Sequence, residues 1–242
     1  NSHFSFTARK KGHVAFIGGS ITAMNGYRPM LCGFLQKRFP ETKFTFTNAG
    51  ISSTCSTSGA FRLQRDVLSK GPVDLFFIEY AVNDDQDATH ARRECIRGME
   101  GILRQVHAHN PMADIVITHF VNPGMLKTVG QGKEPVSSGA HEDVAKHYGV
   151  STIHLIREVD RLIAAGELTW RKFGGTHPGP HGNRLCAKMI EKLLTSSWSM
   201  KPADKAAKVA HALPKKELDA GSYGAGRFID PATAEIKTGW KN

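Results

Sequence analysis

The chain has 242 residues, of which 40% are hydrophobic and 22% are charged. This composition is typical of one large globular domain and excludes a disordered, collagen-like or disulfide-rich chain. Lysine and arginine number 32 against 22 aspartates and glutamates, which gives a net charge of +10. The basic residues form short clusters without an RNA-binding, zinc-finger or basic-zipper motif, so an ordinary solvated surface is favoured over nucleic-acid binding. No stretch approaches the about 20 apolar residues that a membrane-spanning helix needs.

The four cysteines are far apart in the sequence and form no CxxC pair. They are Cys32, Cys55, Cys95 and Cys186. We expect free, partly buried thiols, with one or two disulfides as the alternative. A zinc site is not expected, because zinc ligands normally come in closer pairs.

Residues 1–195 alternate between strand-like and helix-like segments. In chain order, these are strand 13–17, helix 27–39, strands 43–48 and 73–80, helix 89–109, strand 115–120, a Gly- and Pro-containing loop 122–135, a helix to 148, strand 151–155, and helices 156–165 and 181–195. The alternation predicts an α/β fold: a three-layer α/β/α sandwich with a mostly parallel, about five-stranded, flavodoxin-like sheet.

The last residues, 196–242, have little periodicity and are rich in Ala, Gly, Lys and Pro. We therefore expect a domain over 1–195 and a C-terminal extension over 196–242. The extension either wraps the domain, links it to a further module or is partly disordered. Its aromatic residues Tyr223, Phe228 and Trp240 argue against complete disorder.

Four polar or glycine-containing motifs stand where strands or loops end, at the edge where parallel sheets bind ligands. The first strand ends in GGSIT, which contains Ser20, and the second is followed by Gly50. The third strand is followed by AVND, which contains Asn83, and a loop before the last helix carries His177. Each motif alone is also common in ordinary turns, helix caps or loops.

In this order, the four motifs resemble those of the SGNH (GDSL-like) hydrolase superfamily over residues 10–195. GGSIT is similar to the first block, with Gly19 where aspartate often stands, and Gly50 matches the second block. AVND resembles the third-block GxND with Ala81 in place of glycine, and the HPxxxG of the last block begins at His177.

The resemblance implies a serine esterase mechanism. Ser20 would attack an ester carbonyl while His177 takes its proton and later returns it to the leaving alcohol. The oxyanion hole would consist of the N–H groups of Ser20 and Gly50 and the side-chain amide of Asn83. No metal or organic cofactor is expected.

One departure concerns the partner of the histidine. The superfamily usually has aspartate three residues before it, where this chain has Gly174. A backbone carbonyl near Phe173 or Gly174 accepts a hydrogen bond from the imidazole, another carboxylate substitutes, or catalysis is impaired. We favour a carbonyl-supported Ser–His dyad, because a neutral acceptor also fixes the tautomer.

Two further clusters have simpler interpretations. His177 and His181 are four residues apart, but the prolines between them argue against a helical metal site. Asp84, Asp85 and Asp87 are expected to cap the following helix or to line the pocket rim, rather than to act as paired glycosidase acids.

We therefore expect an ester hydrolase that removes small acyl groups, such as acetyl, from a carbohydrate. The alternatives are a lysophospholipase or thioesterase, and a polysaccharide-binding protein whose catalytic site has decayed. The positive charge would suit an acidic polysaccharide. Because carbohydrate-directed members of the superfamily are commonly exported, the resemblance favours a periplasmic or secreted location; it leaves the oligomeric state open.

Overall fold

The structure, a computed structural model, describes residues 1–199, 208–233 and 235. Its five strands form one sheet in the order β2-β1-β3-β4-β5, with every neighbouring pair parallel. The strands are β1 (Lys11–Gly18), β2 (Lys43–Gly50), β3 (Leu75–Glu79), β4 (Asp114–Thr118) and β5 (Ser151–Ile153). The predicted flavodoxin-like sheet is confirmed, and its topological switch point lies between β1 and β3.

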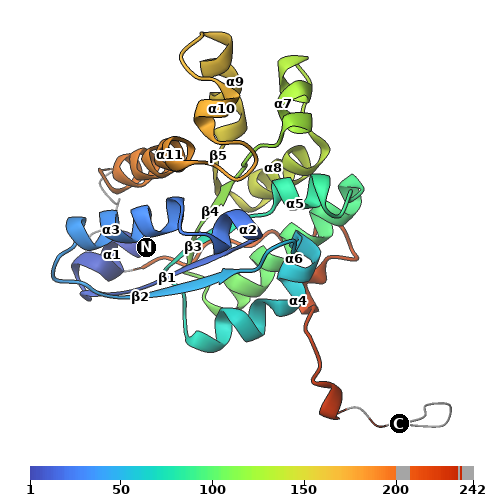
Figure 1. The fold of residues 1–242 in the computed structure, drawn as a ribbon. Helices are drawn as coiled ribbons and strands as arrows, with labels where there is room; N and C mark the ends of the chain where they lie inside the picture. The colour runs from blue at the N-terminus through green and yellow to red at the C-terminus, as the bar shows by residue number, and fades with distance from the viewer. Residues whose placement is uncertain (200–207, 234, 236–242) are drawn as a thin grey trace.

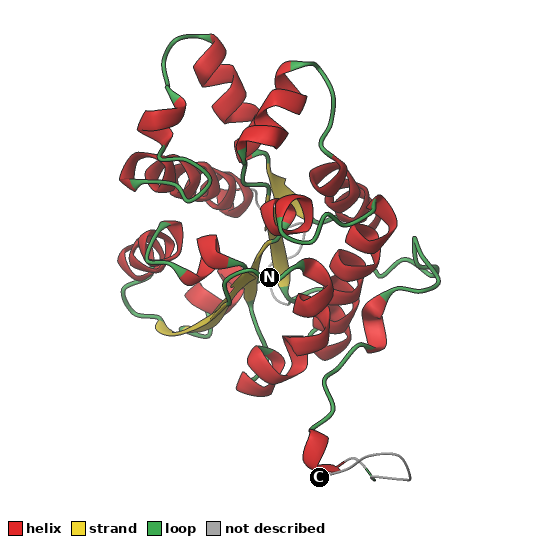
Figure 2. Ribbon diagram, turned by 45° about the vertical axis from the view of Figure 1, so that its right-hand side comes forward, coloured by secondary structure: helices red, strands yellow, loops and turns green. Residues whose placement is uncertain are grey.

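Helices cover both faces of the sheet, as Figures 1 and 2 show. Side chains alternate along β1, so that Val14 and Phe16 pack into one layer and Ala15 and Ile17 into the other. The first layer contains α1 (Ser2–Thr7), α3 (Tyr27–Arg38), α9 (Leu155–Ala164) and α11 (Pro180–Ser199). The second contains α4 (Ser56–Asp66), α6 (Arg92–His109) and α8 (Val136–Tyr148). This arrangement is the predicted three-layer sandwich.

Short helices follow the carboxyl ends of several strands. They are α2 (Ser20–Ala23) after β1, α5 (Ala81–Gln86) after β3 and α7 (Pro123–Gly130) after β4, while α10 (Trp170–Phe173) precedes the loop of His177. Three 3-10 turns are η1 (Leu68–Lys70), η2 (Tyr223–Ala225) and η3 (Pro231–Thr233). Within the described ranges, no helix combines the length and apolar character needed to cross a bilayer.

The segment 122–135, which we expected to be a loop, contains helix α7. The side chain of Asn122 accepts a hydrogen bond from the N–H of Met125 at 2.8 Å, and Pro123 occupies the first helical turn. Both features stabilise a helix N-terminus. Met125 is buried in the core. The loop prediction was wrong because it gave weight to the Gly and Pro content and overlooked this capping signal.

Residues 208–228 of the C-terminal extension lie against the domain, chiefly along α6, whereas the chain from there to η3 extends away from it (Figure 1). The carboxylate of Asp219 accepts hydrogen bonds from Arg93 and Arg97, and the hydroxyl of Tyr223 donates to Glu94 at 2.6 Å. The expected boundary at residue 195 falls inside α11. Residues 200–207, 234 and 236–242, which include Trp240, lie outside the described residues, so the presence of a further module stays a prediction.

Candidate active site

The carboxyl ends of the strands bring Ser20 and His177 together. Ser20 follows β1 through Gly19 and is the first residue of α2, where it is half-buried. His177 lies in the loop between α10 and α11 and is exposed. The hydroxyl Oγ of Ser20 is 2.7 Å from Nε2 of His177. This is hydrogen-bond distance, the arrangement that a nucleophile and its general base require.

The loop of His177 is held in place by Asn183 on α11. The buried amide of Asn183 donates to the carbonyl of Pro178 at 2.5 Å, and its Oδ1 accepts from the N–H of Tyr27 at 2.8 Å. Because Tyr27 begins α3, one side chain connects the histidine loop to the helix that packs beside α2. Asn183 therefore fixes the loop without touching the imidazole.

The other imidazole nitrogen of His177, Nδ1, has no hydrogen-bond partner among the described residues. The carbonyl of Phe173 instead accepts from the N–H of Gly179 at 3.0 Å. The carbonyl support that we expected from Phe173 or Gly174 is therefore not formed. Gly174 has a φ of +107°, and a Cβ there would lie 1.9 Å from the backbone nitrogen of Gly179. The usual aspartate does not fit this loop conformation.

The three expected oxyanion donors lie at the same edge of the sheet, but two already have acceptors. The N–H of Ser20 opens α2 and so has no acceptor within that helix. The N–H of Gly50, expected to be free, donates to Oδ1 of Asn48 at 3.0 Å. The side-chain amide of Asn83 donates to Oδ2 of Asp87 at 2.6 Å, which leaves its second N–H hydrogen.

Two glycines allow this close packing. A Cβ at Gly19 would lie 2.1 Å from Oδ1 of Asn83, so the absence of a side chain at Gly19 lets the Asn83 amide approach the nucleophile turn. A Cβ at Gly50 would lie 2.3 Å from the backbone nitrogen of Ala23. Both positions therefore require glycine for reasons of space.

Arg62, which the sequence did not reveal as important, connects the end of β1 to the residue that follows β3. Its buried guanidinium donates to the carbonyl of Gly18 at 3.1 Å and to the hydroxyl of Tyr80 at 2.7 Å. It also pairs with Asp66 at 3.0 Å. The ends of β1 and β3 are thus held at a fixed separation beside Ser20. Nothing in the sequence around Arg62 distinguishes it from a solvated helical arginine.

A second missed group is Glu79, the last residue of β3, which is completely buried. Its Oε2 accepts a hydrogen bond from the hydroxyl of Thr22 at 3.2 Å. Burial raises the pKa of Glu79 to about 7, against the hydrogen bonds from Thr22 and the Gly19 backbone, which lower it. The sequence did contain a signal for this group, because Glu79 is a carboxylate near the end of the otherwise apolar run VDLFFIEY.

The acidic cluster after Asn83 has roles that differ from the expected ones. Asp84 is fully buried and accepts from the N–H of Ser56 at 2.8 Å, so it caps α4 rather than the following helix. It also accepts from Nε2 of His141 at 2.9 Å. Burial raises the pKa of Asp84, but hydrogen bonds, led by that from His141, hold it well below its usual range. Asp85 accepts from Asn122 at 2.8 Å.

The cysteines and the histidine pair bear on metal binding at this site. All four cysteines are free thiols, as expected. In the described residues, the groups of side chains with the spacing of metal ligands include neither His177 nor His181. The groups that the candidate site does offer are the nucleophile Ser20, the base His177 and the hydrogen-bond donors described above.

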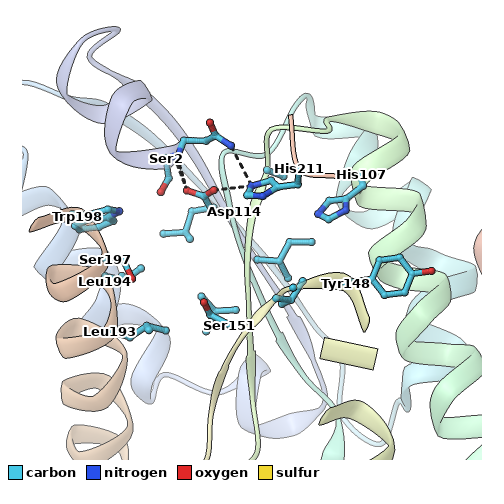
Figure 3. A pocket seen from close by; sticks show the side chains of 17 residues that line it. Ser2, His107, Asp114, Tyr148, Ser151, Leu193, Leu194, Ser197, Trp198 and His211 are labelled. Atoms are coloured by element: carbon cyan, nitrogen blue, oxygen red, sulfur yellow. Dashed lines mark hydrogen bonds and ion pairs between the residues drawn. The ribbon is translucent and has the colours of Figure 1, made fainter. Parts of the chain in front are cut away.

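A separate cavity of about 230 Å³ lies at the opposite, amino ends of β4 and β5. Figure 3 shows it, with Asp114 bonded to His211 and with Trp198 on its far wall. None of the candidate catalytic residues lines it. Because open parallel sheets bind ligands beyond their carboxyl ends, we assign the site to the edge that carries Ser20.

Comparison with known proteins agrees with this geometry. The sequence pattern of the GDSL-like Lipase/Acylhydrolase family matches residues 16–185, which confirms the resemblance of the four motifs. No curated protein sequence matches the chain.

Several solved structures are similar. A two-domain esterase active on acetylated mannans, co-crystallized with mannopentaose, has a TM-score of 0.68 and 26% identity over 84% of this chain and 55% of that one. A second structure of such an esterase has a TM-score of 0.71 and 24% identity, over 89% of this chain and 58% of that one. The chain thus spans little more than half of their length. A catalytic mutant of an acetylxylan esterase from Geobacillus stearothermophilus has a TM-score of 0.59 and 18% identity, over 79% of this chain and 97% of that one.

Proposed function

This chain belongs to the GDSL-like lipase/acylhydrolase family, a family of carboxylic ester hydrolases, and on this premise we propose that it removes acetyl groups from a carbohydrate. The single observation that carries the proposed mechanism is the 2.7 Å distance between Oγ of Ser20 and Nε2 of His177. The mannan-directed esterase at 26% identity supports the choice of an acetylated polysaccharide.

In the proposed reaction, Oγ of Ser20 attacks the acetyl carbonyl while Nε2 of His177 takes the hydroxyl proton. The tetrahedral intermediate then collapses, and His177 gives the proton to the leaving sugar oxygen. Water, deprotonated by the same imidazole, then attacks the acetyl group on Ser20, and His177 returns the proton to Oγ of Ser20 as acetate leaves. Each step uses the one nitrogen that faces the serine, so Nδ1 of His177 keeps its proton throughout.

The developing oxyanion is proposed to receive hydrogen bonds from Ser20, Gly50 and Asn83. For Gly50, the substrate oxygen must replace Oδ1 of Asn48, which holds the same N–H at 3.0 Å. For Asn83, the Asp87 carboxylate fixes one N–H hydrogen and leaves the other for the substrate. Loss of one oxyanion donor typically costs about 100–1,000-fold in turnover.

A dyad without a carboxylate is consistent with this scheme. The third member of a triad orients the imidazole and stabilises its charged form, without itself being protonated. In this chain, Asn183 fixes the loop position, and His177 is exposed with no described residue bonded to Nδ1. We propose that this arrangement supplies the orientation but less stabilisation of the imidazolium.

The test measures ester hydrolysis over a series of acyl lengths, with p-nitrophenyl acetate, butyrate and octanoate, and acetate release from acetylated mannan and xylan. The proposal predicts that kcat/KM is highest for acetate and that Ser20→Ala and His177→Ala are inactive, while His181→Ala retains activity. A preference for octanoate would favour the lysophospholipase or thioesterase alternative. Binding to polysaccharide without turnover of any ester would favour the decayed, binding-only alternative.

The net charge of +10 suggests a refinement of the substrate class. If the polysaccharide is acidic, its attraction to the basic surface weakens as salt is added. Hydrolysis of an anionic acetylated glycan should then fall with ionic strength more steeply than that of a neutral one. Equal salt responses would exclude an acidic substrate preference.

A further inference from the structure

We propose that His119, Glu142 and His154 form a binding site for one zinc-class divalent ion, separate from the catalytic pair. His119 directly follows β4, and His154 directly follows β5 and precedes α9. Glu142 lies on α8. The site therefore occupies the β4–β5 side of the same carboxyl edge that carries Ser20 on its β1 side.

The two distances from Glu142 to the imidazoles match those between ligands of a tetrahedral ion. Oε2 of Glu142 is 3.4 Å from Nε2 of His119 and 3.2 Å from Nε2 of His154. One ligand atom from each of the three residues lies within 4.8 Å of the others. With bonds of about 2.0–2.1 Å to nitrogen and oxygen, tetrahedral geometry places ligand atoms about 3.3–3.4 Å apart.

The hydrogen bonding of the cluster is incomplete. His119 is fully buried, and neither of its ring nitrogens has a hydrogen-bond partner. Oε2 of Glu142 is likewise buried and unpartnered, because its contacts with the two imidazoles are poorly aligned for hydrogen bonds. Nε2 of His154 has the hydroxyl of Thr152 as a neighbour at 3.4 Å. Unpaired buried polar atoms are destabilising, and an ion bound between Nε2 of His119 and Oε2 of Glu142 would satisfy these two atoms, while Nδ1 of His119 would stay unpaired.

The chemistry of the donors fits this ion. Two imidazoles and one carboxylate are the protein ligands of several zinc sites that keep a fourth position for water. An imidazole binds a metal through a neutral ring nitrogen and a carboxylate through a charged oxygen, so these residue types suit one divalent ion.

The cluster borders a solvent-facing cavity on the His154 side. His154 lines a cavity of about 270 Å³ together with Ser138 and the ion pair of Glu134 and Arg157. The side chain of His154 is 28% exposed, whereas that of His119 is inaccessible. An ion approaching through this cavity would meet His154 first, and a water molecule there would complete its coordination.

A second group, Asp84, His90 and Cys95, also has the spacing of metal ligands. Its carboxylate already accepts three hydrogen bonds, two from Ser56 and one from His141. Burial also raises the pKa of the Cys95 thiol, which disfavours the thiolate that binds metals. This group therefore serves as the internal control.

The experiment titrates chelator-treated protein with Zn²⁺ by calorimetry and with Co²⁺ by visible absorption. We expect one ion per chain and the visible band of tetrahedral Co²⁺ without sulfur-to-cobalt charge transfer, because no thiolate is among the ligands. Glu142→Gln and His154→Ala should each weaken binding at least about 100-fold, since even loss of an outer partner costs about 10–100-fold. His90→Ala should bind as the parent protein does.

Circular dichroism and the melting temperature show whether each variant is folded, and Glu142→Gln preserves the shape of the side chain. Zn²⁺ should raise the melting temperature of the parent protein and of His90→Ala, but not of the two ligand variants. The proposal is overturned if the parent protein does not bind Zn²⁺, if binding survives both ligand substitutions, or if Co²⁺ gives a sulfur charge-transfer band that His90→Ala removes.

Discussion

Oγ of Ser20 lies 2.7 Å from Nε2 of His177, although 157 positions separate the two residues in the chain. The end of β1 places the serine, and the loop between α10 and α11, fixed by Asn183, places the histidine. On the far side of the imidazole, no described residue hydrogen-bonds to Nδ1. The placement of the two residues thus comes from the segments around them, and we propose that they act as a dyad.

Replacing Gly174 with aspartate should lower the activity and not restore a triad. Its φ of +107° disfavours any side chain, and the added Cβ would collide with Gly179 and displace the histidine loop. A displacement of about 1 Å can cost about 100-fold in rate, so we expect kcat of Gly174→Asp to fall by about that factor. Steady-state kinetics on p-nitrophenyl acetate measures it.

The control for backbone strain is Gly166→Asp. Gly166 has a φ of +70° with open space around its Cα, so its variant should lose stability but keep kcat. An increase of kcat in Gly174→Asp would mean that the loop accommodates an aspartate after all.

Gly19→Ala should impair the oxyanion donor beside it. The new Cβ would overlap Oδ1 of Asn83 and push the amide away from the nucleophile turn. We expect a fall in kcat approaching the about 100-fold loss of an oxyanion donor, with KM little changed. Gly33→Ala, at an exposed position of α3 with no atom near its Cβ, should keep kcat and gain about 0.5–1 kcal/mol in stability. Equal kcat in the two variants would contradict this account.

Asn48→Ala should raise kcat/KM. In the free protein, Oδ1 of Asn48 accepts the hydrogen bond of the Gly50 N–H, and the oxyanion must displace this oxygen. One neutral hydrogen bond contributes about 0.5–1.5 kcal/mol, which corresponds to a rate gain of about 2–12-fold when it no longer competes. The same kinetic assay checks this, with Asn25→Ala as a control for loss of an exposed asparagine nearby. A clear decrease for Asn48→Ala alone would show that Asn48 assists the reaction.

Glu79→Gln should change the dependence of stability on pH. The pKa of Glu79 is about 7 in the folded protein against a usual value of 4.5, so the folded state holds its proton more tightly. The protonated carboxyl therefore contributes fully to the free energy of unfolding below about pH 4.5. This contribution, about 3 kcal/mol, is lost as the pH rises through 7. Urea unfolding at pH 5 and pH 8 should show that the parent protein loses more stability over this interval than Glu79→Gln. Parallel pH profiles would refute the assignment.

The parts of the fold that sequence predicted are those encoded locally. Apolar runs predicted the central strands and alternation of apolar and polar residues predicted β2, and the residues at the strand ends indicated Ser20, Gly50 and Asn83 at one edge. Helix α7 was also encoded locally, by the cap at Asn122, but the Gly and Pro content obscured it.

What sequence did not predict depends on contacts between distant segments. The cap of α4 comes from Asp84, 28 positions away. His119, Glu142 and His154 have no motif spacing, and only the neighbouring ends of β4 and β5 beside α8 bring them together.

The central claim is that Ser20 is a nucleophile activated by His177. Incubation with a fluorophosphonate ester, followed by peptide mass spectrometry, tests this directly, because the reagent esterifies an activated serine hydroxyl and releases fluoride. We predict one adduct per chain, on Ser20, at a rate at least about 100-fold lower in His177→Ala, the minimum that a general base contributes. An adduct on another residue, or the same rate in His177→Ala, would contradict the claim.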